Sequence, residues 1–170
     1  MKYADLHIHT HFSDSTFSPE EVVRLAHKHC LSAISITDHD TVDAVDLTQK
    51  IAEDFSIEVI PGIELTAEVD GKEVHILGYF IDHHDENFLN KLKDLRRVRI
   101  KRIYEMVEKL RQQGLTKIDA DEVICQAGQA AVGRVHLAMA MKKHKLVASV
   151  SEAFRKYIGD DCPAYVGKFR

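Results

Sequence analysis

The stretch Tyr3-Ala4-Asp5-Leu6-His7-Ile8-His9 reads as a short β-strand that ends in metal-ligating residue types. Successive side chains of a strand point to opposite faces, so His7 and His9 project from the same side. Two neutral imidazoles that converge on one point supply half of the ligands of a typical transition-metal site. The segment therefore predicts a metal site at the end of the first strand.

Outward from this strand, β-rich runs alternate with helical patterns over the first eighty residues. The expected strands and helices are Tyr3–Ile8, Pro19–His29, Ala33–Thr37, Thr41–Asp54 and Glu58–Ile63. This order predicts an α/β fold with a parallel sheet built from βα units. Ser18-Pro19-Glu20-Glu21 combines a cap residue, a proline at the first helical position and a glutamate three residues after the cap, which together favour a helix start.

The second half of the sequence is mainly helical in pattern. A hairpin is expected first, with strands Leu65–Val69 and Glu73–Phe80 around an Asp70-Gly71 turn. A long helix from about Asn87 to Gln113 should follow, because its apolar residues recur at helical spacing. Shorter helices are expected at Asp119–Ala127, Arg134–His144 and Ser151–Tyr157, with Asp119 and Ser151 as caps.

Composition places the 170 residues among ordinary globular domains, with 45% hydrophobic residues and a formal net charge of −4. That charge gives no general reason to expect binding to nucleic acid or to an anionic membrane. No apolar run is long enough to span a bilayer, and a soluble cytoplasmic protein is expected. Cys30, Cys125 and Cys162 have no paired spacing, so we expect reduced thiols and neither a disulfide framework nor a zinc knuckle.

Six candidate metal ligands lie at or just beyond the ends of expected strands: His7, His9, Asp14, His39, Glu64 and His75. Imidazoles and carboxylates without thiolate suit manganese, iron or zinc better than calcium, and a carboxylate such as Glu64 can bridge two ions. Divalent ions lower the pKa of bound water and neutralise charge on a phosphoryl oxygen, so hydrolysis is the expected reaction. Asp5 and Asp38 are expected to orient the imidazoles through their free N–H groups. Six further histidines have no comparable spacing and are interpreted as surface residues: His11, His27, His29, His83, His84 and His144.

Several motifs resemble those of the PHP (polymerase and histidinol phosphatase) phosphoesterases. They are Asp5-x-His7-x-His9-Thr10, Ser13-Asp14, Thr37-Asp38-His39-Asp40, Pro61-Gly62-Ile63-Glu64, His75-Ile76-Leu77-Gly78-Tyr79, Gly133-Arg134-Val135-His136 and Pro163-Ala164-Tyr165-Val166. The resemblance extends over nearly all of the chain. It is strongest to the group of 3′,5′-nucleoside bisphosphate phosphatases that also act as 5′-to-3′ exoribonucleases.

This resemblance implies a distorted (β/α)7 barrel with a helical insertion and a site for up to three divalent ions, with manganese preferred and iron or zinc as alternatives. It would place His7, His9 and Glu64 on one ion, Asp14 and His39 on a second, and Glu64 with His75 on a third. It would also assign Arg134 and His136 to the substrate phosphate, with His136 in a catalytic role. A guanidinium fork matches phosphate oxygens, and a histidine could protonate a leaving oxygen. Without the resemblance, Gly133-Arg134 reads as an ordinary helix start.

The chain also departs from the family pattern. Ser15 and Val135 replace a common glycine and proline, and the sequence ends at Arg170 without the histidine and Asp-x-His that complete the family's metal positions. We therefore expect a fragment that lacks the last strands of the barrel, with an incomplete metal site and a sheet edge that a second copy could cover. The expected organisation is residues 1–84 as the N-terminal part of the barrel, 85–160 as the helical insertion and 161–170 as a return toward the barrel.

The leading functional hypothesis is a metal-dependent phosphoesterase in which metal hydroxide attacks phosphorus. The expected substrate is the 5′-phosphate of a nucleoside 3′,5′-bisphosphate or of a short oligonucleotide. A histidinol-phosphate phosphatase is the alternative enzyme, and a non-catalytic metal- or nucleotide-binding remnant is the alternative of another class. The stretch Lys91–Arg111 carries nine basic and three acidic residues. It reads either as a solvated helix face or as a guide for a polyanionic substrate.

Overall fold

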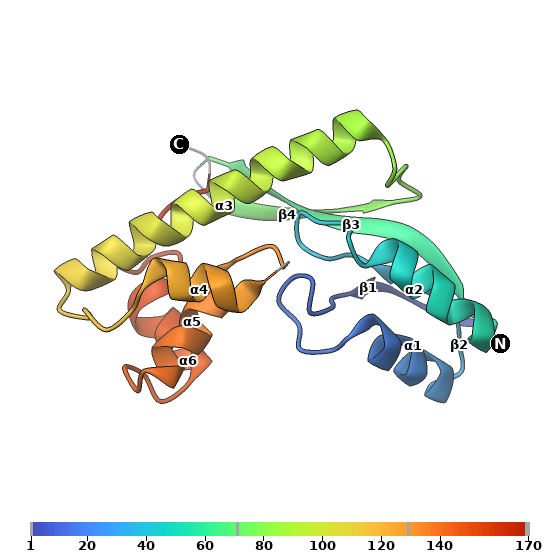
Figure 1. Ribbon diagram of the computed structural model, residues 1–170, viewed down its shortest axis with the longest axis horizontal. Coiled ribbons are helices and arrows are strands. Elements are labelled where there is room, and N and C mark those ends of the chain that lie inside the picture. Colours follow the sequence, from blue (N-terminus) through green and yellow to red (C-terminus); the bar gives the residue numbers. More distant parts are fainter. Residues whose placement is uncertain (1, 71, 129, 169–170) are drawn as a thin grey trace. The chain divides into compact units, whose positions relative to one another are not determined.

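Four strands in the order β1-β2-β3-β4 form a sheet in a mixed α/β fold (Figure 1). The computed structural model describes residues 2–70, 72–128 and 130–168. Strands β1 (Tyr3–Ile8), β2 (Leu31–Ile36) and β3 (Glu58–Val69) are parallel neighbours, and β4 (Lys72–Tyr79) follows next to β3. The expected parallel βα arrangement is therefore observed. Of the expected Asp70-Gly71 turn, Asp70 has a left-handed φ of 52°, and Gly71 lies outside the described residues.

The sheet is curled. Strands β1 and β4 stand at opposite ends of the strand order, yet the Tyr79 hydroxyl on β4 donates a hydrogen bond to the Leu6 carbonyl on β1 at 2.9 Å. Strand β3 is one continuous strand of 12 residues. The expectation of two strands that separate near Glu64 was wrong, because backbone pairing continues through Glu64 despite Pro61 and Gly62. Glu64 thus lies inside a strand, where its backbone pairs with the segment that follows β2.

Helices α1 (Pro19–Lys28) and α2 (Val45–Ala52) pack beside each other against this sheet. The start of α1 has the expected capping box: the Glu21 amide donates to the Ser18 hydroxyl at 3.2 Å, and the Ser18 amide donates to the Glu21 carboxylate at 2.7 Å. Buried side chains of α1, β2 and the start of β3 form a first hydrophobic core, and they include Val23, Ile34 and Ile36.

Gly62 permits the close approach of β3 to β2 next to Glu64. A Cβ at this position would lie 2.2 Å from Ser35 Oγ and 3.0 Å from the Ile36 carbonyl oxygen. We expect Gly62→Ala to lower the free energy of unfolding by about 1–3 kcal/mol, because the backbone must shift to admit the methyl group. Urea unfolding measures this loss. Gly78→Ala is the control, since its Cβ meets nothing closer than 3.3 Å; equal losses in both variants would contradict the steric explanation.

The second half of the chain contains helix α3 (Glu86–Gln112), α4 (Ala120–Ala127), α5 (Arg134–Lys143) and α6 (Val150–Ala153), with a π-helical turn at Phe154–Ile158. Buried apolar residues of these helices, among them Met106, Leu110, Leu137 and Met141, form a second core. Asp119 caps α4 as expected. Ser149, not Ser151, caps α6, because its hydroxyl accepts the Glu152 amide at 3.1 Å.

The chain divides into two compact units: Met1–Ala67 with Val74–Asp94, and Glu68–Glu73 with Leu95–Arg170. The division falls within α3, and the tip of the β3–β4 segment belongs with the helical unit. The expected partition into residues 1–84, 85–160 and 161–170 follows changes of sequence pattern. The assignment of these segments to a barrel and an insertion stays a prediction.

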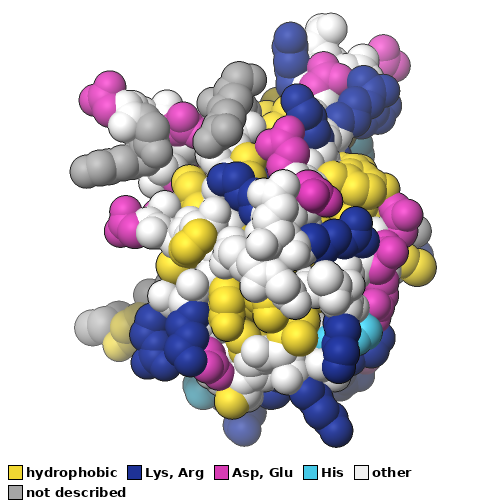
Figure 2. All heavy atoms as spheres, turned by 90° about the vertical axis from the view of Figure 1, so that its left-hand side faces the viewer, with side chains coloured by type: hydrophobic (Ala, Val, Ile, Leu, Met, Phe, Trp, Pro, Cys, Tyr) yellow, Lys and Arg dark blue, Asp and Glu magenta, His cyan; other side chains and the backbone are white. Residues whose placement is uncertain are grey.

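Several basic residues of the 91–111 stretch hold the helical unit together. Arg99 and Arg102 are buried and donate to the carbonyl groups of Val132 and Val166, at 3.3 and 2.7 Å. Lys109 likewise donates to the Tyr165 carbonyl at 2.6 Å. On the face drawn in Figure 2, basic side chains lie in separate groups with acidic side chains between them. These groups fit neither of the two expectations for the stretch, a solvated helix face or a guide for a polyanionic substrate. For the exposed basic residues of the stretch, a role in guiding substrate stays a prediction.

Candidate metal centre

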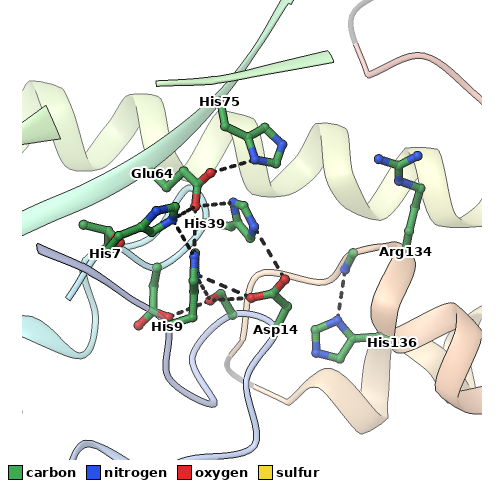
Figure 3. A network of polar contacts seen from close by, with 12 residues as sticks. His7, His9, Asp14, His39, Glu64, His75, Arg134 and His136 are labelled. Atoms are coloured by element: carbon green, nitrogen blue, oxygen red, sulfur yellow. Dashed lines mark hydrogen bonds and ion pairs between the residues drawn. The ribbon is translucent and has the colours of Figure 1, made fainter. Parts of the chain in front are cut away.

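Strand β1 places His7 and His9 side by side, as their spacing predicts. Their Nε2 atoms are 3.1 Å apart, and both face the same oxygen of Glu64, Oε2, at 3.0 and 2.9 Å. Figure 3 shows these imidazoles pointing toward the carboxylate. Three electron-pair donors at such distances repel one another unless a proton or a cation lies between them. The arrangement is therefore one that a cation would stabilise.

Glu64 lies at the centre of the group. Its side chain is only 4% exposed, and its second oxygen, Oε1, is 2.7 Å from His75 Nδ1 on β4. His39 follows β2 and forms an isolated parallel bridge with Glu64, in which the Glu64 amide donates to the Asp38 carbonyl and the Asp40 amide donates to the Glu64 carbonyl. This pairing brings His39 Nδ1 within 3.6 Å of Glu64 Oε2. One carboxylate thus faces four imidazoles.

Asp14 completes the group from the loop that follows β1. Its Oδ2 is 3.5 Å from His39 Nε2, and its Oδ1 is 3.5 Å from His9 Nδ1. The loop returns on itself because the amides of Ser13 and Ser15 both donate to the Thr10 carbonyl. The structure therefore brings together all six residues named from the sequence.

Asp38 holds this loop, a role that its sequence position does not predict. Its buried carboxylate accepts hydrogen bonds from the Thr10 amide at 2.7 Å, the Thr10 hydroxyl at 2.6 Å and the Ser13 hydroxyl at 2.6 Å. The expected direct bond to a ring N–H is replaced by an indirect one, since Ser13 Oγ lies 3.4 Å from His9 Nδ1. Asp5 likewise binds backbone, accepting the His7 amide at 3.2 Å.

Three further residues hold the backbone around the candidate ligands, and the sequence did not predict this role: Thr10, Ser13 and Asp40. Asp40 adopts a left-handed φ of 51°, which is strained for a residue with a Cβ, directly after His39. Its carboxylate accepts the Thr66 amide at 2.9 Å, which ties this bend to β3. Their position in the sequence could have indicated this role. Short polar side chains next to candidate ligands tend to form hydrogen bonds with nearby backbone groups.

We expect Asp38→Asn to destabilise the fold by about 1–3 kcal/mol, because an amide offers a single acceptor oxygen to three buried donors. Manganese affinity should fall about 10- to 100-fold, since the loop carrying Asp14 loses its anchor. Urea unfolding and metal titration measure the two effects. Asp54→Asn, at an exposed position of the same unit, is the control. Wild-type stability and affinity in Asp38→Asn would refute the anchoring role.

The protonation states of the group suit metal ligation at neutral pH. Burial lowers the pKa of His9 below its ordinary value, and the charge of Asp14 only partly offsets this. Burial by itself raises the pKa of Asp14, but hydrogen bonding to His39 and the charges of His39 and His9 bring that pKa down to about 2. Burial likewise raises the pKa of Glu64, and the surrounding histidines outweigh it and lower that pKa overall. Ionised carboxylates thus face a neutral His9.

The six residues form three overlapping sets, each with ligand atoms within 4.8 Å of one another: His7, His9 and Glu64; His9, Asp14 and His39; and His39, Glu64 and His75. Ligand atoms at the usual 2.0–2.2 Å from one cation lie about 3.0–3.5 Å apart, close to the separations seen here. Among the described residues, the buried His39 Nδ1 has no hydrogen-bond partner. The donor set therefore fits divalent cations, and the assignment of each ligand to an ion stays a prediction.

Arg134 and His136 belong to the helical unit. The Arg134 guanidinium lies 2.5 Å from Asp160 Oδ1 and 3.3 Å from Glu73 Oε1, and it lies against the rings of Phe154 and Tyr165. His136 Nδ1 accepts the Gly133 amide at 3.1 Å, which leaves the ring proton on Nε2. A neutral Nε2–H suits hydrogen-bond donation to a phosphate oxygen better than proton transfer. Their phosphate-binding role stays a prediction.

Comparison with known proteins identifies the family. A family model for the PHP domain matches residues 5–162, and the chain belongs to the PHP domain family. The matched range contains all six residues of the metal-binding group as well as Arg134 and His136.

Curated relatives include the 5′-3′ exoribonuclease of Haemophilus influenzae, 29% identical over 97% of this chain and 60% of the relative. The 3′,5′-nucleoside bisphosphate phosphatase of Chromobacterium violaceum is 26% identical over 98% of this chain and 58% of the relative. A crystal structure from Bifidobacterium adolescentis, provisionally described as a metal-dependent phosphoesterase, superposes with a TM-score of 0.87 at 30% identity, over 97% of this chain and 58% of that one. The chain thus spans between about half and two thirds of the length of these proteins. Within the described residues, no helix has the length and apolar character needed to cross a bilayer.

Proposed function

We propose that this chain forms part of a metal-dependent phosphoesterase that removes a phosphate from the 5′ end of a nucleotide or short oligonucleotide. The observation that carries the proposal is the convergence of four imidazoles and Asp14 around the buried Glu64 carboxylate. The names of the relatives, an exoribonuclease and a nucleoside bisphosphate phosphatase, support the nucleotide class of substrate. The (β/α)7 barrel of which these four strands would form part belongs to the same proposal.

Divalent cations, with manganese as the first candidate, would supply water of lowered pKa and charge neutralisation at a phosphoryl oxygen. His7, His9, Asp14, His39, Glu64 and His75 would hold them. In this proposal Ser13 keeps the ring proton of His9 on Nδ1, and so leaves the lone pair of Nε2 available to a cation that Glu64 would also bind. Arg134 would offer its guanidinium to phosphate oxygens, which requires it to exchange the carboxylates of Asp160 and Glu73 for the substrate. His136 would donate from Nε2.

The test is phosphate release from a nucleoside 3′,5′-bisphosphate by the protein at its full genomic length, supplied with manganese. Histidinol phosphate serves as the competing substrate. We expect release from the bisphosphate that His9→Ala abolishes and that His29→Ala, at an exposed position of the same unit, leaves unchanged. Faster release from histidinol phosphate would replace the substrate class. Metal binding without hydrolysis of either compound would favour a binding module.

A further inference from the structure

A second group of ligand-type side chains lies in the first unit, apart from the six residues described above. It consists of Asp46, His83 and His84, whose ligand atoms lie within 4.8 Å of one another. Asp46 stands in the first turn of α2, and the two histidines stand in the turn between β4 and α3. From the sequence alone, both histidines are expected to be surface residues, because their positions show no spacing typical of metal ligands.

The geometry of this group is that of converging ligands. His83 Nε2 and His84 Nε2 approach the same oxygen, Asp46 Oδ1, at 2.9 and 3.3 Å. The two rings lie 4.1 Å apart, centroid to centroid, with a tilt of 37°. Two imidazolium groups so close would repel each other, whereas two neutral imidazoles and a carboxylate can share one cation.

The turn that carries the histidines is held in place. The Asp82 side chain accepts the His84 amide at 3.1 Å, and the Asp82 carbonyl accepts the Asp85 amide at 3.3 Å. Asp85 in turn caps the following helix by accepting the Phe88 amide at 2.7 Å. His83 is also enclosed, with a side chain only 11% exposed. A preformed turn lowers the ordering cost of ligand binding.

We propose that Asp46, His83 and His84 form a separate site for a divalent cation of the zinc type. Two imidazoles and one carboxylate make three protein ligands, which leaves one tetrahedral position for water. Nitrogen-rich sites bind zinc more tightly than manganese, because the affinity of such sites is higher for zinc than for manganese among the first-row metals. Magnesium prefers oxygen ligands. The bound ion would join α2 to the β4–α3 turn, across 37 positions of sequence. Its role is to brace the first unit.

The experiment measures zinc binding by calorimetry in a chain that carries His9→Ala and Glu64→Gln, which together remove at least one ligand from each of the three sets of the six-residue group. We expect about one equivalent of zinc to remain and to disappear when Asp46→Asn and His84→Ala are added. These two positions are exposed, so the changes spare the core. Asp54→Asn with His29→Ala is the matched control, which should retain the equivalent. Loss of the remaining equivalent in the control as well, or its persistence in the test variant, would overturn the proposal.

A second measurement uses the unaltered chain and does not depend on the folding of the quadruple variant. Zinc should raise the melting temperature by several degrees more in the parent than in Asp46→Asn/His84→Ala, and magnesium should give no such difference. Because the readouts are stoichiometry and thermal stability, a protein that fails to release phosphate could still show this site. Equal zinc-induced shifts in parent and variant would refute the bracing role.

Discussion

Glu64→Gln is expected to abolish phosphate release and to weaken manganese binding at least about 100-fold. The substitution keeps the size of the side chain and removes its charge. One carboxylate faces His7 and His9 through Oε2 and His75 through Oε1, so two of the three ligand sets lose their anionic member together. The neutral amide also turns an NH2 group toward one of these imidazoles. Manganese titration and phosphate-release assays measure the two losses.

Glu58→Gln is the control for this prediction. It makes the same change in the same strand at an exposed position, away from the imidazoles. We expect wild-type metal affinity and activity from it. A Glu64→Gln protein that retains manganese affinity within about threefold of the parent would show that the buried carboxylate is not a shared ligand.

The second prediction concerns pH. Manganese affinity should fall about 100-fold between pH 7.5 and pH 5.5, because protons compete with the ion for imidazole nitrogens. An imidazole of ordinary pKa is only about one tenth neutral at pH 5.5, so an ion held by two imidazoles loses about tenfold in affinity for each of them. Titration of manganese at a series of pH values measures the effect. A pH-independent affinity over this range would mean that carboxylates alone bind the ion.

The metal-free chain should also lose stability on acidification, and the signs follow from the pKa shifts. The folded pKa of His9 is below its ordinary value of 6.5, so the unfolded chain binds the proton first and stability falls as pH drops below about 6.5. The carboxyl groups of Asp14 and Glu64 also have lowered pKa values, so their contribution is present above about pH 4.5 and is lost as pH falls further, toward 2 for Asp14. Urea unfolding in chelator from pH 7.5 to 3.5 should therefore show two successive losses. A constant stability over that range would contradict the shifts.

The gathering of the six residues could be predicted because it depends on strand ends. The alternation of side chains along β1 orients His7 and His9, and the parallel register of β2 and β3 brings His39 next to Glu64. These are local regularities combined with one topological rule. Predicting that these residues meet therefore required no information about individual side-chain rotamers.

The roles of Asp38 and of the arginines could not be predicted, because they depend on which polar atoms remain unpaired after folding. A buried carboxylate between a loop and a strand binds the nearest donors, and for Asp38 these are the groups of Thr10 and Ser13. Arg99 and Arg102 read as part of an exposed basic run, yet they donate to carbonyl groups of distant segments. Charge and periodicity alone do not distinguish a solvated guanidinium from one that satisfies buried backbone.

Strand β1 has one neighbouring strand in the described sheet order, and its residues are exposed except for the partly buried Ile8. The backbone that carries His7 and His9 therefore has little apolar burial to keep it ordered. A bound cation would stabilise strand β1, which hydrophobic packing stabilises little. The occupancy of the site and the rigidity of this strand should therefore rise and fall together. For such a protein, the availability of metal would govern how long the segment that carries His7 and His9 resists proteases.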